Sequence, residues 1–235
     1  MPTRNNRTSV IQSMKLFRDV PDSICREMLG SARPRDFKRG DFLFLAGAAA
    51  SEVFLLTSGR VRIIQANENG EEVMLRIDPP GELIGSLEKN LQGTRNSTAE
   101  AIEESKTLLW DAQTFETALN RFPILERNLQ QILEQRICEL GQRFCEVATA
   151  KASSRLACEL VRLLKQIGRK RNGQSEVKIP HEWVAEMAAM SQFTVSRFLA
   201  KWERQGVVSV RRGTVTIRNY DGLRRLCQPS RQPVI

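Results

Sequence analysis

The sequence is poor in the side chains from which enzymes and metal sites are usually built. It has one histidine, His181, among 235 residues, and its five cysteines are scattered without metal-ligand spacing. They are Cys25, Cys138, Cys145, Cys158 and Cys227. No convergent Cys/His group or paired-carboxylate motif is visible, so we expect no catalytic residue and no metal ligand. We expect most of the cysteines to be reduced and to serve in packing.

Long apolar runs and a signal peptide are also missing. No stretch is long and apolar enough to span a bilayer, and the N-terminus lacks the pattern of a secretory signal. We therefore expect a cytoplasmic protein with no membrane partner. The length of 235 residues suggests one large or two ordinary domains, and a hydrophobic content of 41% is enough for real cores.

Acidic residues are scarce in only one part of the chain. Residues 151–235 hold 17 Lys+Arg against 6 Asp+Glu, a net charge of +11, whereas residues 1–150 hold 19 against 21, a net charge of −2. The whole basic excess therefore lies in the C-terminal region. This distribution indicates a domain that binds nucleic acid.

Residues 179–206 predict two short helices joined by a tight turn. Pro180 suits the first position of a helix, Ser191 suits the N-cap of a second helix, and Gly206 suits its end. Apolar residues recur at i, i+3, i+4 and i+7 in the second helix. This spacing predicts a buried stripe of Val195, Phe198, Leu199 and Trp202.

The opposite face of the second helix is polar and basic. It carries Gln192, Phe193, Ser196, Arg197, Lys201 and Arg204. Such a face fits the major groove of DNA, although a helical hairpin with a solvated charged face would have the same pattern. Valines on both sides of Arg211-Arg212-Gly213 predict a short β-hairpin with a basic turn, and a helix-turn-helix followed by such a hairpin is a winged helix. The combination favours DNA binding.

The N-terminal half has a different pattern. Residues 37–110 contain short apolar strands separated by glycines and by the hairpin signal Asn69-Gly70, which predicts a sandwich or barrel. A helix from Leu119 to about Lys151 follows, with Pro123 in its first turn. The fold class is therefore α+β. We expect an N-terminal antiparallel β-roll of the double-stranded β-helix or jelly-roll type, a long dimerisation helix and a C-terminal winged helix-turn-helix.

The dimerisation role of the long helix is predicted from a heptad seam. Apolar residues with spacings of 4, 3, 4 and 3 lie at Leu133, Ile137, Leu140, Phe144 and Val147. This is the pattern of a two-helix coiled coil and favours a homodimer, whereas packing on the chain's own β domain would use part of the same helix. Cys138 and Cys145 each follow a seam position, so they serve either in packing or in a redox role.

The order β-roll, long helix and winged helix resembles the Crp/Fnr superfamily of bacterial transcription regulators over nearly the whole chain. The resemblance rests on the glycines of the β-roll, on Arg95 with Ala99 and Ala101, on Arg155, and on M-S-Q-F-T-V-S-R at 190–197. The glycines are Gly47, Gly59, Gly70, Gly81 and Gly85. It implies a cyclic-nucleotide-binding-like sensor domain with N-terminal helices in residues 1–118, a dimerisation helix in 119–151, and a DNA-binding domain in 152–235.

The resemblance also implies a homodimer that reads a palindromic DNA site and works with RNA polymerase. Phosphate contacts are expected from His181, Ser191 and Thr194. Base edges would be read by Gln192, Ser196 and Arg197. Arg197 is the best candidate for guanine, because arginine binds O6 and N7 with two hydrogen bonds. Further candidates for contacts to DNA are Lys201, Arg211 and Arg212.

Two positions in this region depart from the family pattern. Phe193 stands where a Glu usually accepts a bond from cytosine, so we expect a half-site different from the usual one, with Phe193 packing on thymine methyl groups. Ala189-Met190 occupies a turn where Gly is common, at a cost of about 1 kcal/mol.

The sensor end departs further from the members that bind cyclic AMP. The expected effector site comprises Gly85, Ser86, Arg95, Asn96, Leu140 and Gly141. Arg95 matches the family's phosphate ligand, but Ser86, Asn96 and the pair Leu140-Gly141 replace the other main contacts. We therefore expect an effector other than cyclic AMP, or none, and Arg95 either binds another anion or pairs with an acid in the roll.

The sequence also lacks suitable ligands for two redox cofactors, an iron–sulphur cluster and haem. An iron–sulphur cluster needs four thiolates, and Cys25 has no N-terminal partners. The single histidine lies in the DNA-binding domain, which argues against haem. A competing interpretation remains open, in which a roll that binds a cyclic nucleotide or another anion regulates a protein partner. The β-roll alone would support it, and the basic winged helix argues against it.

Overall fold

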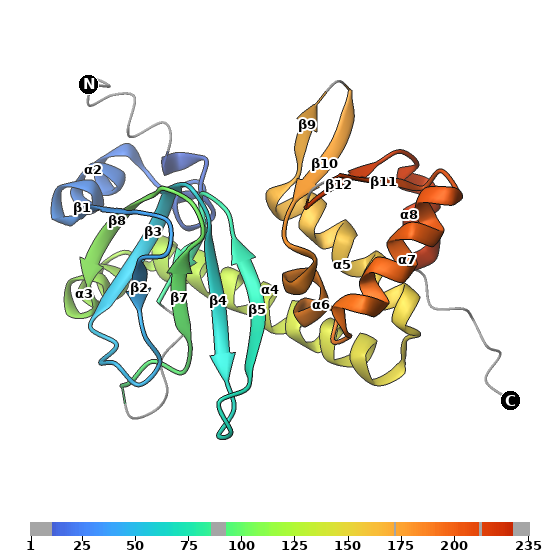
Figure 1. Ribbon diagram of the computed structural model, residues 1–235. Coiled ribbons are helices and arrows are strands. Elements are labelled where there is room, and N and C mark those ends of the chain that lie inside the picture. The colour runs from blue at the N-terminus through green and yellow to red at the C-terminus, as the bar shows by residue number, and fades with distance from the viewer. Residues whose placement is uncertain (1–10, 86–92, 172, 212, 228–235) are drawn as a thin grey trace, which may run out of the picture. The chain divides into compact units, whose positions relative to one another are not determined.

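The computed structural model describes residues 11–85, 93–171, 173–211 and 213–227 (Figure 1). The chain divides into two compact units, residues 1–139 and 140–235, which are described separately. The division falls within a single helix, α4 (Pro123–Thr149). The domain limits expected from the sequence, after residues 118 and 151, stay predictions.

The first unit is built on two antiparallel sheets. Its strands are β1 (Arg33–Phe37), β2 (Phe42–Phe44), β3 (Glu52–Ser58), β4 (Val61–Ala66), β5 (Glu72–Asp78), β6 (Leu83–Ile84), β7 (Thr98–Ala101) and β8 (Ser105–Asp111). One sheet has the order β1-β8-β3-β6 and the other β2-β7-β4-β5. Apart from the hairpin of β4 and β5, neighbours within a sheet are far apart along the chain, so the strands pass back and forth between the sheets. This arrangement confirms the predicted antiparallel β-roll.

The turn signal Asn69-Gly70 lies where it was predicted, between the paired strands β4 and β5. The side chain of Asn67 accepts hydrogen bonds from the backbone N–H groups of Asn69 and Glu71, at 3.0 and 2.9 Å. Gly70 has φ +80°, a left-handed conformation that glycine adopts without the strain of a Cβ atom. The turn chemistry of the sequence therefore fixes this hairpin.

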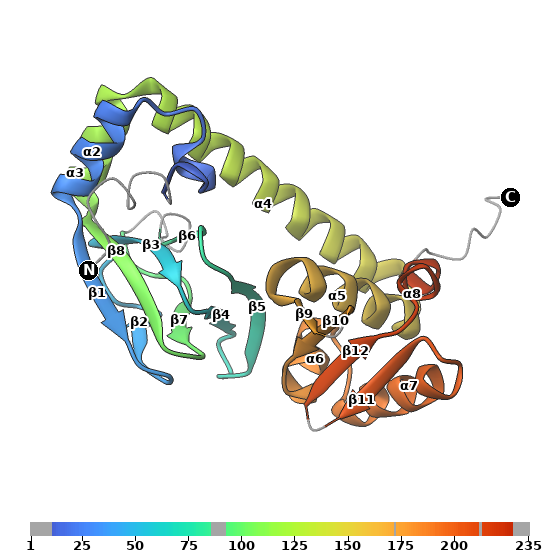
Figure 2. The same ribbon diagram turned by 90° about the horizontal axis from the view of Figure 1, so that it is seen from above.

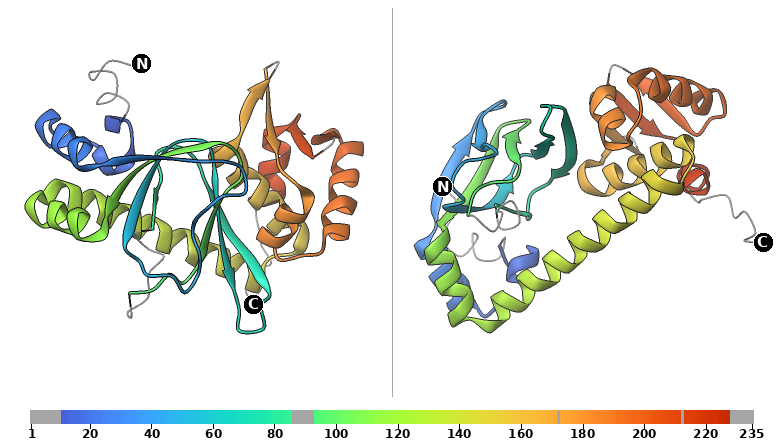
Figure 3. Two further views of the ribbon diagram at one scale, coloured as in Figure 1. Left: turned by 60° about the vertical axis from the view of Figure 1, so that its left-hand side comes forward. Right: turned by 90° about the horizontal axis from the view of Figure 1, so that it is seen from below.

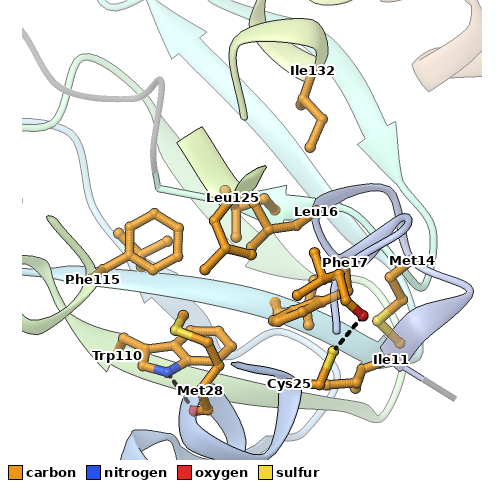
Figure 4. Packing of buried hydrophobic residues seen from close by; sticks show 14 residues of the cluster. Ile11, Met14, Leu16, Phe17, Cys25, Met28, Trp110, Phe115, Leu125 and Ile132 are labelled. Carbon is orange, nitrogen blue, oxygen red and sulfur yellow. Dashed lines mark hydrogen bonds between the residues drawn. The ribbon is translucent and has the colours of Figure 1, made fainter. Parts of the chain in front are cut away.

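Strand β3 is buried on both faces, so it separates two cores. Successive side chains of a strand point to opposite faces. Phe54 and Leu56 enter the core between the two sheets, and Val53 and Leu55 enter a second core that lies under the helices. Figure 4 shows this second core, in which Trp110 donates a 2.9 Å hydrogen bond to the carbonyl of Met28.

Three helices cover the second core. They are η1 (Lys15–Phe17), α2 (Asp22–Ser31) and α3 (Ala112–Arg121), and an ion pair between Arg121 and Glu27 joins α3 to α2, which lie side by side (Figures 2 and 3). Cys25 of α2 is packed in this core. Burial raises the pKa of its thiol, and the charge of Asp22 adds to the effect, so the group stays a neutral thiol.

The first half of α4 packs on η1 and on the β-roll through buried polar side chains. Asn128 donates to the carbonyls of Leu16 and Arg18 at 2.9 and 2.8 Å. Arg136 donates to the carbonyl of Leu83 at 2.8 Å. Part of the helix is thus used against the chain's own β domain, as expected. The predicted single helix from residue 119 was inaccurate at its start, because α3 ends at Arg121 and α4 begins at Pro123.

The described part of the second unit is a winged helix. Its elements are α5 (Ala152–Ile167), β9 (Arg169–Arg171), β10 (Gln174–Lys178), α6 (His181–Met187), α7 (Gln192–Arg204), β11 (Val208–Arg211), β12 (Thr214–Ile217) and α8 (Tyr220–Cys227). The four strands form one antiparallel sheet with the order β11-β12-β10-β9. The helix-turn-helix and the following hairpin occupy the predicted residues, which confirms the third part of the fold class.

Buried ion pairs join the last turns of α4 to α5. Glu159 is fully buried, and it accepts from Arg143 at 3.2 Å and from Arg162 at 2.8 Å. Burial alone would lower the pKa of Arg162. Hydrogen bonds from its guanidinium to Glu146, together with the charge of Glu159, outweigh burial and raise that pKa. The end of α4 is therefore part of the second compact unit.

Three features of this unit have no clear signal in the sequence. The basic residues after α5 form a hairpin of β9 and β10. The N-cap of α5 is Lys151, without a side-chain hydrogen bond. Cys158 and Cys227 form a disulfide bond, which the scattered cysteines had not suggested. The other three cysteines are free, as expected for most of the five.

Candidate nucleic-acid interface and effector site

Helix α7 separates its apolar side chains from its polar ones. Val195, Leu199 and Trp202 are at most 1% exposed, whereas Phe198 is half-buried and stacks on Trp202. The opposite face is exposed to solvent along its length. It presents Gln192, Phe193, Ser196, Arg197 and Lys201. Phe193 is 77% exposed, so its ring is available for contact with another molecule.

The N-terminus of α7 is capped as the sequence predicted. The Ser191 hydroxyl accepts from the backbone N–H of Thr194 at 3.2 Å, and the two hydroxyl oxygens are 2.9 Å apart. The cap satisfies a backbone donor that has no partner within the helix. It also places both hydroxyl groups beside the first turn of the helix, where the positive end of the helix dipole attracts anions.

The turn between α6 and α7 is held by Arg155 of α5. Its guanidinium donates to the carbonyls of Ala150 at 3.1 Å, Ala188 at 3.0 Å and Ala189 at 3.0 Å. Ala189 has φ +51°, so the absence of a glycine in this turn carries the expected strain. Two of these bonds stabilise the strained turn, and the bond to Ala150 ties the same guanidinium to the segment before α5. The sequence marked Arg155 only as a family residue and gave no sign of this role.

The wing is tied to both helices of the helix-turn-helix. The N–H of Ile179 donates to the carbonyl of Gly213 at 2.8 Å, which joins the tip of the wing to the start of α6. The N–H of Val210 donates to the carboxylate of Glu203 at 2.9 Å. Glu203 is the one acid of α7, and this bond to β11 gives it a structural role that sequence reasoning missed. Arg211 is exposed at the end of β11, and Arg212 lies outside the described residues.

His181 is the first residue of α6 and is not on the exposed face of α7. Its side chain is half-buried, and its Nε2 is buried without a hydrogen-bond partner among the residues that the structure describes. The helix N-terminus and the imidazole together offer donors to an anion. The structure therefore places His181 in the same helix-turn-helix as the other candidates but on a different helix.

The described effector residues of the first unit meet around Arg95. Arg95 is 3% exposed, and it donates to the carbonyl of Gly85 at 2.6 Å and to the carbonyl of Glu52. Its guanidinium carbon lies 4.1 Å from the centroid of the Phe44 ring. Gly85 has φ +93°, and a Cβ atom there would lie 2.9 Å from the Glu52 carbonyl oxygen, so the position requires glycine. The guanidinium thus braces two backbone segments.

The remaining effector candidates are less well placed. Asn96 is exposed next to the buried Arg95, and Ser86 lies outside the described residues. Leu140 and Gly141 belong to the second unit, where Leu140 is 55% exposed and no atom lies within 4 Å of a Cβ added at Gly141. The structure therefore brings together Gly85 and Arg95 from this set.

A hollow of about 320 Å³ lies in the first unit, where residues 13–15 and residues 80–82 come together. It is lined by Ser13, Met14, Lys15, Thr57, Pro80, Gly81 and Glu82. Glu82 forms ion pairs with Lys15 at 2.6 Å and with Arg136 at 3.2 Å. Burial would raise the pKa of Glu82, but the hydrogen bonds and charges of Lys15 and Arg136 outweigh it, so the pKa is lowered. The carboxylate stays ionised at neutral pH and links the roll to α4.

The predicted seam on α4 is largely uncovered. Leu133 is half-buried, and the other four members are at least 50% exposed: Ile137, Leu140, Phe144 and Val147. The side chains of α4 that are buried lie on other faces, with Leu125 and Ile132 in the core under the helices. A continuous apolar face of this kind favours association with another surface.

Within residues 11–85, 93–171, 173–211 and 213–227, we find no cluster of three or more His, Cys, Asp or Glu side chains that could hold a metal ion. Over the same residues, none of the helices combines the length and the apolar character needed to cross a bilayer.

Comparison with known proteins identifies the family. Residues 34–122 match the cyclic nucleotide-binding domain family, and residues 154–226 match the Crp-like helix-turn-helix domain family. The chain is 30% identical to the cyclic AMP receptor protein of Thermus thermophilus, over 78% of this chain and 83% of that protein. It is 24% identical to the CRP-like cAMP-activated global transcriptional regulator of Mycobacterium tuberculosis, over 89% of this chain and 95% of that protein.

A solved structure agrees with this result at the level of the fold. A CRP/FNR-family transcriptional regulator from Thermus thermophilus is 24% identical, with a TM-score of 0.68, and the match covers 83% of this chain and 98% of that one. The two domain matches and the 30% identical relative together define the class: this chain belongs to the Crp/Fnr family of transcription regulators, with a helix-turn-helix domain for DNA.

Proposed function

We propose that the protein is a homodimeric, sequence-specific transcription regulator that reads a palindromic promoter site in the cytoplasm. The observation that carries this proposal is the exposed face of α7, where Arg197 and the 77% exposed Phe193 lie opposite the buried Val195, Leu199 and Trp202. A helix that keeps its apolar stripe in the core and presents long polar side chains can enter the major groove.

The contacts divide into those that read bases and those that position the protein. Gln192, Ser196 and Arg197 contact base edges, and Phe193 packs on thymine methyl groups. Phosphates are bound from the rim of the same surface, where contacts fix register without reading sequence. These contacts come from His181, Ser191, Thr194, Lys201, Arg211 and Arg212.

Dimerisation uses the seam of α4. The exposed side chains of Ile137, Leu140, Phe144 and Val147 cost free energy in water, and pairing with the same stripe of a second copy removes them from it. In such a dimer the two recognition helices would lie about 34 Å apart, one turn of DNA. Contacts with RNA polymerase then follow from the position of the site in the promoter.

The sensor roll responds to an effector other than cyclic AMP, or needs none. Cyclic AMP is named for the relatives in Thermus thermophilus and Mycobacterium tuberculosis. In this chain Ser86, Asn96 and Leu140-Gly141 replace residues with which family members hold that nucleotide. Mass spectrometry of the protein purified from its own host tests the point, and cyclic AMP at one molecule per subunit would overturn it.

The DNA-reading role is tested by selection from random duplexes followed by substitution. We expect an enriched palindrome, and we expect Arg197→Ala to abolish preference for it while weak, salt-sensitive binding remains. Lys165→Ala, which removes one exposed positive charge on α5, is the control and should retain the preference. Equal losses on random and selected DNA would refute the role of Arg197. If no palindrome is enriched, the β-roll acting on a protein partner becomes the better explanation.

A further inference from the structure

The disulfide bond between Cys158 and Cys227 is not explained by the proposed contacts with DNA. Cys158 is buried in α5, Cys227 is half-buried at the end of α8, and their Cα atoms are 4.6 Å apart. The match to the helix-turn-helix family ends at residue 226, one residue before Cys227. The match therefore includes Cys158 and leaves out Cys227.

Helix α8 packs along α5, and the disulfide is the covalent link between the two helices. It contains eight residues, and a helix of that length is not stable in water on its own. Among the described residues of α8, Leu223 is the one fully buried apolar side chain, and Arg224 and Arg225 are exposed. Its first turn is capped by the side chain of Asn219, which accepts from the N–H of Gly222 at 2.7 Å. Its last turn is fixed to α5 by the disulfide.

The attachment of α8 also fixes the wing. Strand β12 pairs with both β11 and β10, and it leads into α8 through Arg218 and Asn219. The N–H groups of these two residues donate to the carbonyl of Val207 at 3.0 and 3.1 Å. If the last turn of α8 loosens, β12 loses its downstream anchor. The hairpin that carries Arg211 then becomes less ordered.

We propose that Cys158 and Cys227 form a reversible thiol–disulfide site, and that oxidation by a low-molecular-weight disulfide strengthens DNA binding by fixing α8 and the wing. The proposal rests on the proposed function as a DNA-binding regulator. DNA lies in a reducing compartment of the cell, where disulfides are typically transient and regulatory. A disulfide bond that forms in this compartment therefore signals a shift to more oxidising conditions.

Reduction of the Cys158–Cys227 bond consumes two small thiols and releases one small disulfide, and oxidation is the reverse of this reaction. The thiolate of the first attacks the more accessible sulfur, that of Cys227, and forms a mixed disulfide while Cys158 leaves with the electron pair and takes up a proton. A second thiol attacks the mixed disulfide, so that two protein thiols and one small disulfide result. Arg224 lies one turn before Cys227 on the same side of α8, and its positive charge attracts anionic thiols such as glutathione.

The two exposed thiols of α4 must be removed before the test, because they would react with the same reagents. The test therefore uses full-length protein with Cys138→Ser and Cys145→Ser, which leaves Cys25 in its core. The protein is equilibrated with defined ratios of oxidised and reduced glutathione. Thiol trapping and mass spectrometry then measure the fraction with the Cys158–Cys227 bond.

Affinity for the selected operator is measured by fluorescence anisotropy in both redox states. We expect the oxidised protein to bind about tenfold more tightly, the effect of one ordered charge-assisted contact. Amide hydrogen exchange in residues 213–227 should be faster after reduction. A Cys227→Ser variant should bind like the reduced protein at every glutathione ratio. The comparison of two states of one protein needs no substitution at the site, so misfolding of the variant would not spoil it.

Two results would overturn the proposal. One is equal affinity and equal exchange in the bonded and reduced protein, and the other is a bond that does not respond to glutathione. If neither state binds any selected DNA, the proposed function fails. In that case the trapping and exchange measurements still decide separately whether the site responds to glutathione and whether it anchors α8.

Discussion

Substitution of Arg155 by alanine should loosen the helix-turn-helix more than any change on its DNA-facing surface. The guanidinium donates three hydrogen bonds, to the carbonyls of Ala150, Ala188 and Ala189. The bonds to Ala188 and Ala189 reach the turn, and a hydrogen bond from a partly exposed charged donor contributes about 1–2 kcal/mol net, so the two together contribute about 2–4 kcal/mol. The strained φ of Ala189 relies on this support.

The assay is amide hydrogen exchange of the intact protein, read in peptides from α6 and α7. We expect Arg155→Ala to lower the free energy of local opening there by about 2–4 kcal/mol and to leave the β-roll unchanged. Arg204→Ala is the matched control. Its guanidinium makes one weak 3.4 Å bond to the carbonyl of Ala200 in its own helix, so the loss should stay below about 0.5 kcal/mol. A loss in Arg155→Ala no greater than in the control would refute the reasoning.

Three more predictions concern single residues. Ala189→Gly should stabilise the second unit by about 1 kcal/mol, because glycine adopts φ +51° without strain, and a lower urea midpoint would contradict this. Glu82→Gln should reduce the acid sensitivity of the first unit, monitored by Trp110 fluorescence. The pKa of Glu82 in the folded protein is lowered from 4.5, so the ionised carboxylate stabilises the fold above pH 4.5 and this stabilisation is lost as pH falls through the folded-state pKa. A variant with the same pH profile of unfolding as the parent would contradict this prediction. Phe144→Glu should produce a monomer in sedimentation velocity, because it places a charge in the seam, whereas Gln142→Glu, on another face of α4, should leave the dimer intact.

The elements with local signals could be predicted from the sequence. Helix α7 was found because its cap, Ser191, and its apolar stripe are encoded within a dozen neighbouring residues. The β4–β5 turn was found for the same reason, through Asn69-Gly70. By contrast, β9 has no such local signal. Its residues Arg169–Arg171 have no apolar alternation, and they form a strand because β10 offers them a paired edge.

Contacts between distant residues could not be predicted. Cys158 and Cys227 are 69 residues apart, and five scattered cysteines do not indicate which two meet. The bonds of Arg155 to the turn of the helix-turn-helix also depend on packing that no spacing encodes. Of the effector residues, the sequence indicated that Gly85 and Arg95 act together, and they do meet. It gave no sign that Arg95 would use its donors on the backbone of Gly85 and Glu52.

The two faces of α7 are free to evolve independently. Val195, Leu199 and Trp202 hold the helix in place, and Glu203 secures the neighbouring strand. The attachment of α7 to the domain does not depend on Gln192, Phe193, Ser196 or Arg197. A lineage can therefore exchange its operator, and with it an entire set of controlled genes, by a few surface replacements that leave the scaffold as stable as before.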